Sequence, residues 1–233
     1  MSSEKYSRQE LFLGKQEKLS AAKVVIVGVG ALGTVAAELL VRAGVGEIVL
    51  VDFDGVEESN LQRQSLFTEK DVGKNKALAA AERLREINSL VQIKFYPVRL
   101  EEGNLNLLDH ADVVLGCTDD LESRFLINKY CVKKNIPWVY GAAVKAQGYA
   151  MAIVPDGPCL NCFLKKAVDL DNACTVGVLN TITYAIPALQ VQLVLDILIG
   201  REVKAELYYL DLWQKEFKKL KVKKDAGCEI CRK

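Results

Sequence analysis

Four cysteines are grouped in two C-x-x-C pairs, Cys159 with Cys162 and Cys228 with Cys231. The two-residue spacer lets both thiolates of a pair reach one ion, and two such pairs complete a tetrahedral zinc site. Four cysteine ligands leave no position for substrate or water, so the predicted site is structural and pins the second pair onto the body of the fold. Two disulfides or separate buried thiols are the alternatives.

Gly28, Gly30 and Gly33 form a G-x-G-x-x-G turn between a predicted strand and a predicted helix. Glycines at this spacing permit a tight turn, close approach of the backbone to phosphate, and close packing of helix on strand. Asp52 ends the next strand, where a carboxylate can bind ribose hydroxyls. The motif therefore predicts a nucleotide site, and by itself it leaves NAD open as the nucleotide.

Polar and cationic residues that follow the second strand favour a triphosphate over a redox cofactor. Arg63 can bind phosphate oxygens through two parallel hydrogen bonds, and Asn60 adds a polar group beside it. Lys76 supplies a point charge, with Lys74 as a near competitor. Asp119 follows a later strand, and a carboxylate there can hold magnesium. These side chains are expected at one edge of the sheet, beyond the carboxyl ends of its strands.

The elements that must position these residues alternate between strands and helices. Buried apolar runs predict strands at 23–30, 47–52, 92–100 and 111–117, with one or two more in 137–155. Helices are predicted at 31–43, 73–88, 120–135 and 181–200, and an exposed loop at 165–175. Residues 206–222 alternate apolar and charged side chains, which indicates antiparallel strands with one wet face.

We therefore expect a single α/β domain over residues 1–233. Its sheet is Rossmann-like, doubly wound and mostly parallel, with antiparallel C-terminal strands pinned by the zinc site. The nucleotide-binding part spans about 20–155 and the zinc-pinned part about 156–233.

Composition is that of an ordinary soluble protein, with 50% hydrophobic and 26% charged residues. The net charge of +1 gives no global attraction to nucleic acid or membrane. The first ten residues carry charges of both signs and no apolar segment, so we expect a cytoplasmic protein. The apolar run 182–199 is interrupted by polar residues and a proline, which favours a buried core helix over a membrane span.

The ordered motifs resemble the ThiF/MoeB/HesA family, the bacterial and archaeal relatives of the ubiquitin-activating enzymes. They are YSRQ, GVGALG, SNLQRQ, VGKNKA, CTDD, C-L-N-C, CTVGVL and C-E-I-C, and they run from Tyr6 to Cys231. The resemblance implies a homodimer that binds ATP and magnesium. It also implies adenylation of the C-terminal Gly-Gly carboxylate of a small ubiquitin-fold sulfur-carrier protein, with release of pyrophosphate, for molybdopterin, thiamin or tRNA thiolation.

The resemblance also implies roles for single residues. Asp52 would hold the ribose, Arg63 and Lys76 the phosphates, and Asp119 the magnesium ion. Arg8, in YSRQ, would reach across the dimer into the partner's ATP site. Without a rhodanese-like domain in this sequence, sulfur would come from a separate donor protein.

Three further residues have roles that must be considered one by one. Cys174 matches a cysteine that forms a covalent link in some family members, and a buried packing role is the alternative. Asp120 stands where many relatives have Asn, so it either adds negative charge near the nucleotide or points away. His110, the single histidine, matches no family motif and is expected to be structural.

Several other functions would also use these residues. Adenylation of another carboxylate, borne by a tRNA or a peptide, is one alternative, and an NAD-dependent oxidoreductase or a non-catalytic dimer partner are others. The lysine-rich run 215–224 is the one candidate for a nucleic-acid-binding patch. Its alternation of charged and apolar residues is more simply explained as the solvent-exposed face of a strand. A partner protein would dock on apolar surface, for which Phe163, Leu164 and residues 208–213 are candidates.

Overall fold

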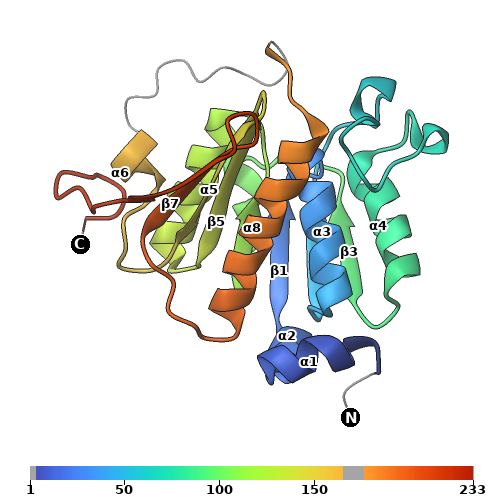
Figure 1. Ribbon diagram of the computed structural model, residues 1–233, viewed down its shortest axis with the longest axis horizontal. Helices are drawn as coiled ribbons and strands as arrows, with labels where there is room; N and C mark the ends of the chain where they lie inside the picture. The colour runs from blue at the N-terminus through green and yellow to red at the C-terminus, as the bar shows by residue number, and fades with distance from the viewer. Residues whose placement is uncertain (1–3, 165–175, 233) are drawn as a thin grey trace.

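The computed structural model describes residues 4–164 and 176–232, and its strands form an eight-stranded sheet (Figure 1). Their order is β3-β2-β1-β4-β5-β6-β7-β8. The strands are β1 (Lys23–Val27), β2 (Glu47–Val51), β3 (Gln92–Tyr96), β4 (Val113–Gly116), β5 (Trp138–Val144), β6 (Gln147–Ile153), β7 (Glu206–Asp211) and β8 (Glu216–Lys221). Pairing is parallel from β3 to β5 and antiparallel from β5 to β8, which confirms the predicted mixed sheet.

The central strands are buried on both faces. β1 and β2 pair with Val24 opposite Ile48 and Val27 opposite Val51, and their β-branched side chains are almost fully enclosed. Strands of this kind require helices on both sides of the sheet. The apolar runs in the sequence therefore predicted the buried strands β1 and β2 correctly.

Helices cover both faces of the sheet, as expected for a doubly wound fold. The helices are α1 (Ser7–Leu13), α2 (Gln16–Ala21), α3 (Ala31–Ala43), α4 (Lys76–Ile87), α5 (Leu121–Lys134), α6 (Leu160–Leu164) and α8 (Asn180–Leu198). α3, α4 and α8 pack on one face and α5 and α6 on the other, each with its own hydrophobic cluster (Figure 1). Short 3-10 turns occur at Glu4–Tyr6, Glu58–Asn60, Glu69–Asp71 and Glu102–Leu108.

Local capping fixes where the site helices begin and end. α3 starts after Gly30 and stops at Gly44, which adopts φ +77°. The side chain of Asp120 accepts a hydrogen bond from Ser123 N at 2.7 Å and so caps α5, which ends at Asn135 in the left-handed region. The predicted bounds of this helix, 120–135, are thus its two cap residues.

Some expectations differ from the structure. The predicted strand 23–30 ends at Val27, because Gly28 has φ +89° and turns the chain out of the sheet. The predicted strand 92–100 ends at Tyr96. α1 and α2 were not predicted; they lie at the amino ends of the strands (Figure 1). The predicted loop 165–175 lies outside the described residues.

α8 is long and apolar enough to cross a membrane by length and composition alone, which is weak support for such a role. In the structure its inner side chains Ile182, Ile186 and Val194 are fully buried, and the helix packs against α3, β5 and β6. Lys15 Nζ donates to the carbonyl of Ile199 at the end of this helix, at 3.0 Å. The packing agrees with the predicted core helix.

Candidate active site

A cleft of about 300 Å³ opens at the carboxyl ends of β1, β2 and β4. Its walls include Gly28, Gly30, Asp52, Asn60, Arg63, Lys76 and Asp119. These residues span much of the sequence, and the parallel pairing of the strands brings them to one edge. The structure therefore gathers the residues that the sequence singled out for nucleotide binding.

Glycine is needed at the three positions of the turn for different physical reasons. A Cβ on Gly28 would lie 2.7 Å from the carbonyl oxygen of Cys117, and a Cβ on Gly33 would overlap the carbonyl oxygen of Gly28. Gly30 is different, because its nearest neighbour would be Gln64 Nε2 at 3.7 Å. Packing within the protein requires Gly28 and Gly33, whereas Gly30 keeps the cleft side of the turn open for a close ligand.

Asp52 joins the glycine turn to the loop after β2. Its Oδ2 accepts a hydrogen bond from Val29 N at 2.6 Å, and its Oδ1 accepts one from Asp54 N at 2.8 Å. Burial raises the pKa of this carboxyl group, although the two backbone hydrogen bonds and Lys76 act in the opposite direction. The carboxylate is thus fixed in orientation at the cleft wall, where it can accept hydrogen bonds from hydroxyl groups.

Lys76 begins α4 and points its ammonium group into the cleft. Its Nζ lies 3.1 Å from Asp54 Oδ2, and only 10% of its side chain is exposed. Lys74 instead pairs with Asp71 at 2.9 Å and does not line the cleft. The structure therefore separates the two competing lysines and gives the cleft position to Lys76.

Asn75, which was not among the predicted site residues, holds the start of α4 against the end of β2. Its Nδ2 donates to the carbonyls of Asp52 and Asp54 at 3.2 and 3.1 Å, and its Oδ1 caps the helix at Leu78 N. The signal was present, because Asn directly before a helix-forming run is a preferred N-cap. Its bonds tie Lys76 to the same loop that carries Asp52.

Arg63 and Asn60 belong to the loop after β2. Arg63 is half-buried and uses one N–H, from Nη1, to bind the carbonyl of Ser59 at 2.8 Å. A guanidinium group has five N–H donors, so this bond orients it while leaving donors for an anion. Asn60 is buried, and its Oδ1 accepts from Glu57 N at 3.2 Å, so it also supports the loop.

Asp119 lies on an exposed turn that is fixed from the side of α5. Arg124 donates from Nε and Nη2 to the carbonyl of Thr118 at 3.0 and 2.7 Å, and its guanidinium group lies 5.6 Å from the centre of the Tyr140 ring. Asp120 also lines the cleft, and its carboxylate is engaged there as the cap of α5. No sequence pattern pointed to Arg124, which is buried near the start of α5.

Two polar atoms in the cleft walls are buried without a hydrogen-bond partner among the described residues. They are Gln64 Oε1 and Thr118 Oγ1, and Gln64 as a whole is only 4% exposed. Buried polar atoms in native structures are almost always paired with protein, water or ligand. Together with the lysine, arginine and carboxylate groups, they fit a cleft built for a polar, phosphate-bearing ligand.

One predicted residue of the nucleotide site stands apart from this cleft. Arg8 is exposed on α1, at the amino ends of the strands, and it does not line the cleft of its own chain (Figure 1). Cys174 lies outside the described residues. His110 is exposed with φ +60° in the loop before β4 and does not line the cleft.

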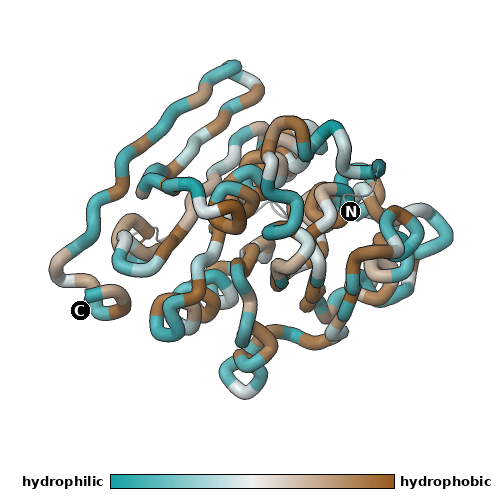
Figure 2. Tube along the Cα trace, turned by 90° about the horizontal axis from the view of Figure 1, so that it is seen from below, coloured by the Kyte–Doolittle hydropathy of each residue, from teal (hydrophilic) through white to brown (hydrophobic). Residues whose placement is uncertain are grey.

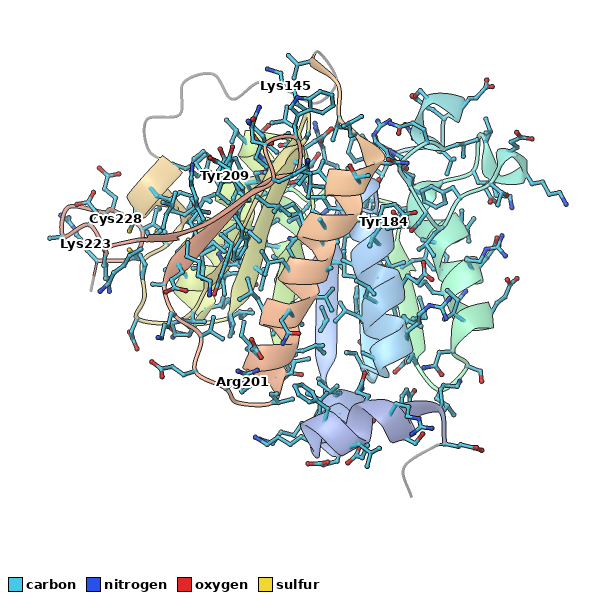
Figure 3. All side chains as sticks on the ribbon, in the orientation of Figure 1. Lys145, Tyr184, Arg201, Tyr209, Lys223 and Cys228 are labelled. Carbon is cyan, nitrogen blue, oxygen red and sulfur yellow. The ribbon has the colours of Figure 1, made fainter. Side chains whose placement is uncertain are left out.

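The four paired cysteines converge beside α6. Their sulfur atoms all lie within 4.8 Å of one another, with Cys159 Sγ 3.6 Å from Cys228 Sγ and Cys162 Sγ 3.4 Å from Cys231 Sγ. A tetrahedral ion with Zn–S bonds of about 2.3 Å needs sulfur atoms about 3.8 Å apart, whereas a disulfide needs about 2 Å. The donor set and its spacing therefore fit one zinc ion. Figure 3 shows Cys228 near α6, well away from α3 and the glycine turn.

Hydrogen bonds hold both halves of the cysteine cluster in place. Asn128 on α5 accepts from Leu160 N at 3.0 Å and donates to Asn161, which anchors the first pair. Asp225 N lies 3.5 Å from Cys162 Sγ, so the tail that carries the second pair also meets the first.

Comparisons with known proteins agree with this geometry. The model of the ThiF family matches residues 3–230. The sulfur carrier protein ThiS adenylyltransferase of Bacillus subtilis is 41% identical, over 97% of this chain and 71% of its own length. The protein of the same name from Escherichia coli is 36% identical over 97% and 94%, and the molybdopterin-synthase adenylyltransferase of that organism is 33% identical over 97% and 95%.

Solved structures show the same fold at lower identity. The crystal structure of E. coli MccB with ATP superposes with a TM-score of 0.87, at 24% identity, and covers 99% of this chain and 75% of that one. The crystal structure of PaaA gives a TM-score of 0.81 at 21% identity, over 95% and 75%. The mixed sheet and its order of elements are thus shared with both proteins.

Proposed function

Because this chain belongs to the ThiF family and is an adenylyltransferase, we propose that it uses ATP to adenylate the C-terminal Gly-Gly carboxylate of a small ubiquitin-fold sulfur-carrier protein, with release of pyrophosphate. Two of its relatives are named for acting on the sulfur carrier ThiS and one for molybdopterin synthase. The observation that carries the proposal is the composition of the cleft. It brings together the glycine turn, the buried carboxylate of Asp52, and the cations of Arg63 and Lys76.

The proposed reaction needs positioning and charge neutralisation more than proton transfer. A carboxylate oxygen of the carrier attacks the α-phosphorus, the bond from that phosphorus to the α,β-bridging oxygen breaks, and the β- and γ-phosphates leave as pyrophosphate, so no acid–base pair is required. Asp52 accepts hydrogen bonds from the ribose, and the N–H groups at the start of α3 face the phosphates beside Gly30. Arg63 and Lys76 neutralise phosphate charge, with Asn60 supporting the loop.

We assign Asp119 as a ligand of magnesium. The ion would neutralise phosphate charge when bound. The assignment rests on its place at the cleft wall and on its exposed carboxylate. Arg124 and the cap made by Asp120 keep the Asp119 turn in position. The ion pair between Lys76 and Asp54 must loosen or share its lysine when phosphate enters the cleft.

The remaining parts of the proposal concern the assembly. The chain works as a homodimer in which Arg8 of one copy reaches the ATP site of the other, because it lies on exposed α1 and outside its own cleft. Cys159, Cys162, Cys228 and Cys231 hold a structural zinc ion. Sulfur comes from a separate donor protein, with Cys174 as a possible covalent residue. The buried Cys117 and Cys131, which form no disulfide in the described part of the chain, and the use of ATP support a cytoplasmic location.

The test is ATP–pyrophosphate exchange by the purified protein, with and without small Gly-Gly-tailed proteins from the same cell. We expect exchange that depends on one carrier and is lost on Arg63→Ala, while the fold is retained. Arg42→Ala is the matched control, because Arg42 is exposed on α3, lies outside the cleft and pairs with nearby Glu38 at 2.8 Å. Tight ATP binding without exchange, for any carrier, would redirect the proposal to a peptide or tRNA-borne carboxylate. Full exchange by Arg63→Ala would remove Arg63 from the mechanism.

A further inference from the structure

We infer that residues 213–224, here called the lysine hairpin, form the surface on which an acidic face of the carrier protein docks. The lysine hairpin comprises the turn after β7, strand β8 and the segment that leads to the second cysteine pair. The inference rests on the proposed function, and it adds the position and the charge of the partner. Four observations on exposure, charge, side-chain direction and location support it.

The lysine hairpin concentrates positive charge in a nearly neutral chain. Residues 215–224 include six lysines and one glutamate, whereas the whole chain carries a net charge of +1. Such a concentration raises the local potential and attracts an acidic partner. Figure 2 shows the hairpin as a long projecting loop whose colour alternates between hydrophilic and hydrophobic.

Apolar side chains interrupt this charge at exposed positions. Trp213 is 75% exposed, Phe217 53% and Leu220 48%. β8 is an edge strand of the sheet, and all six of its residues are exposed. Lysines on an edge strand discourage indiscriminate strand pairing, while a few large apolar groups among them provide anchors for a specific partner.

The direction of the lysine side chains favours a protein over a nucleic acid. Neighbouring residues of a strand point to opposite faces, so Lys218 and Lys219 project on opposite sides of β8. Each is held over a tyrosine of β7, at 5.7 Å from the Tyr209 ring and 5.6 Å from the Tyr208 ring. A nucleic-acid backbone would need the cations on one face of the strand. A protein that docks along the edge of β8 can contact the lysines of both faces.

The hairpin also leads to the nucleotide cleft. A groove of about 440 Å³ lies between the β5–β6 turn, residues 176–179 and the hairpin turn, with Lys145 and Trp213 in its walls. Val178 lines both this groove and the cleft, so the two spaces adjoin. Lys145 lies at the same end of the molecule as the hairpin turn (Figure 3). A carrier on the lysine hairpin could therefore extend a narrow tail past Trp213 toward the cleft.

The experiment measures the KM of the carrier in ATP–pyrophosphate exchange for the wild type, Lys219→Glu and Lys94→Glu. Lys94 is the matched control, because it is exposed on β3, the edge strand at the opposite side of the sheet. For Lys219→Glu at 0.05 M salt we expect the carrier KM to rise about fivefold or more, with kcat and the KM of ATP unchanged. In 0.5 M salt the increase should shrink to about twofold or less, because the screening length shortens to a few ångströms.

The outcomes separate the two proposals. Wild-type exchange with equal carrier KM values for Lys219→Glu and the wild type would overturn the docking site and leave the adenylation function standing. Wild-type protein that shows no exchange with any carrier would overturn both. Total tRNA from the same cells serves as a second probe: tRNA binding that is lost in Lys219→Glu while the carrier KM stays constant would make the lysine hairpin a nucleic-acid surface instead.

Discussion

Replacing Asp52 by asparagine tests whether its carboxylate serves the ligand or only the fold. The change keeps the shape of the side chain but leaves one acceptor oxygen for two backbone donors, Val29 N and Asp54 N. A buried donor without a partner costs about 1–3 kcal/mol, while removal of a buried charge stabilises the folded state. Because these effects oppose each other, we expect the free energy of unfolding to change by less than about 2 kcal/mol.

The loss of ATP affinity should be larger. A hydrogen bond from a ribose hydroxyl to a carboxylate contributes about 1.5–3 kcal/mol, and each 1.4 kcal/mol is a factor of about ten. Asp52→Asn should therefore weaken ATP binding about 10- to 100-fold, as measured by titration calorimetry. Asp112→Asn is the control, because Asp112 also accepts a strand N–H, from Lys23 at 2.8 Å, at the far end of the sheet. A folded Asp52→Asn protein with wild-type ATP affinity would refute the assigned role.

The same variant has a pH signature. Burial raises the pKa of Asp52 above its ordinary value of 3.8, so the folded state binds the proton more tightly than the unfolded state. The stability that this proton provides is complete below pH 3.8 and is lost as the pH rises through the folded-state pKa. The variant has no such proton, so urea denaturation should show its stability gaining on that of the wild type across this window. Parallel pH profiles would contradict the burial argument.

Two further changes test the glycine turn and the cysteine cluster. Gly33→Ala should destabilise the protein by more than about 3 kcal/mol in urea denaturation, because its methyl group overlaps the carbonyl of Gly28. Gly103→Ala, where a methyl group meets nothing within 4 Å, is its control, and equal stability of the two variants would count against the packing argument. Cys228→Ser should lower bound zinc from about one ion per chain and reduce the melting temperature, by elemental analysis and calorimetry. Cys131→Ala, a buried cysteine outside the cluster, should keep its zinc; a Cys228→Ser protein with full zinc content would disprove the four-cysteine site.

Sequence patterns predicted those features that depend on local chemistry. The β-branched runs marked β1 and β2 because strands buried on both faces carry no polar alternation. The helix at 31–43 was predicted to the residue, since Gly44 provides the left-handed cap that ends it. Strand ends were predicted less well, as with β1, because the chain leaves the sheet at Gly28 before its apolar run stops.

The sequence by itself determined the residue types of the two candidate sites, because C-x-x-C spacing and a glycine turn before a helix are local signals. Only the tertiary structure decided which polar groups share the cleft. Lys76 and Lys74 are two residues apart and chemically equivalent, yet Lys76, at the start of α4, pairs with Asp54, whereas Lys74, in the turn before the helix, pairs with Asp71. Arg124 donates a hydrogen bond to the carbonyl of Thr118 on the neighbouring turn, and the spacing of residues in the sequence does not predict this contact. Such choices depend on which strands adjoin, and that is set by packing across the whole sheet.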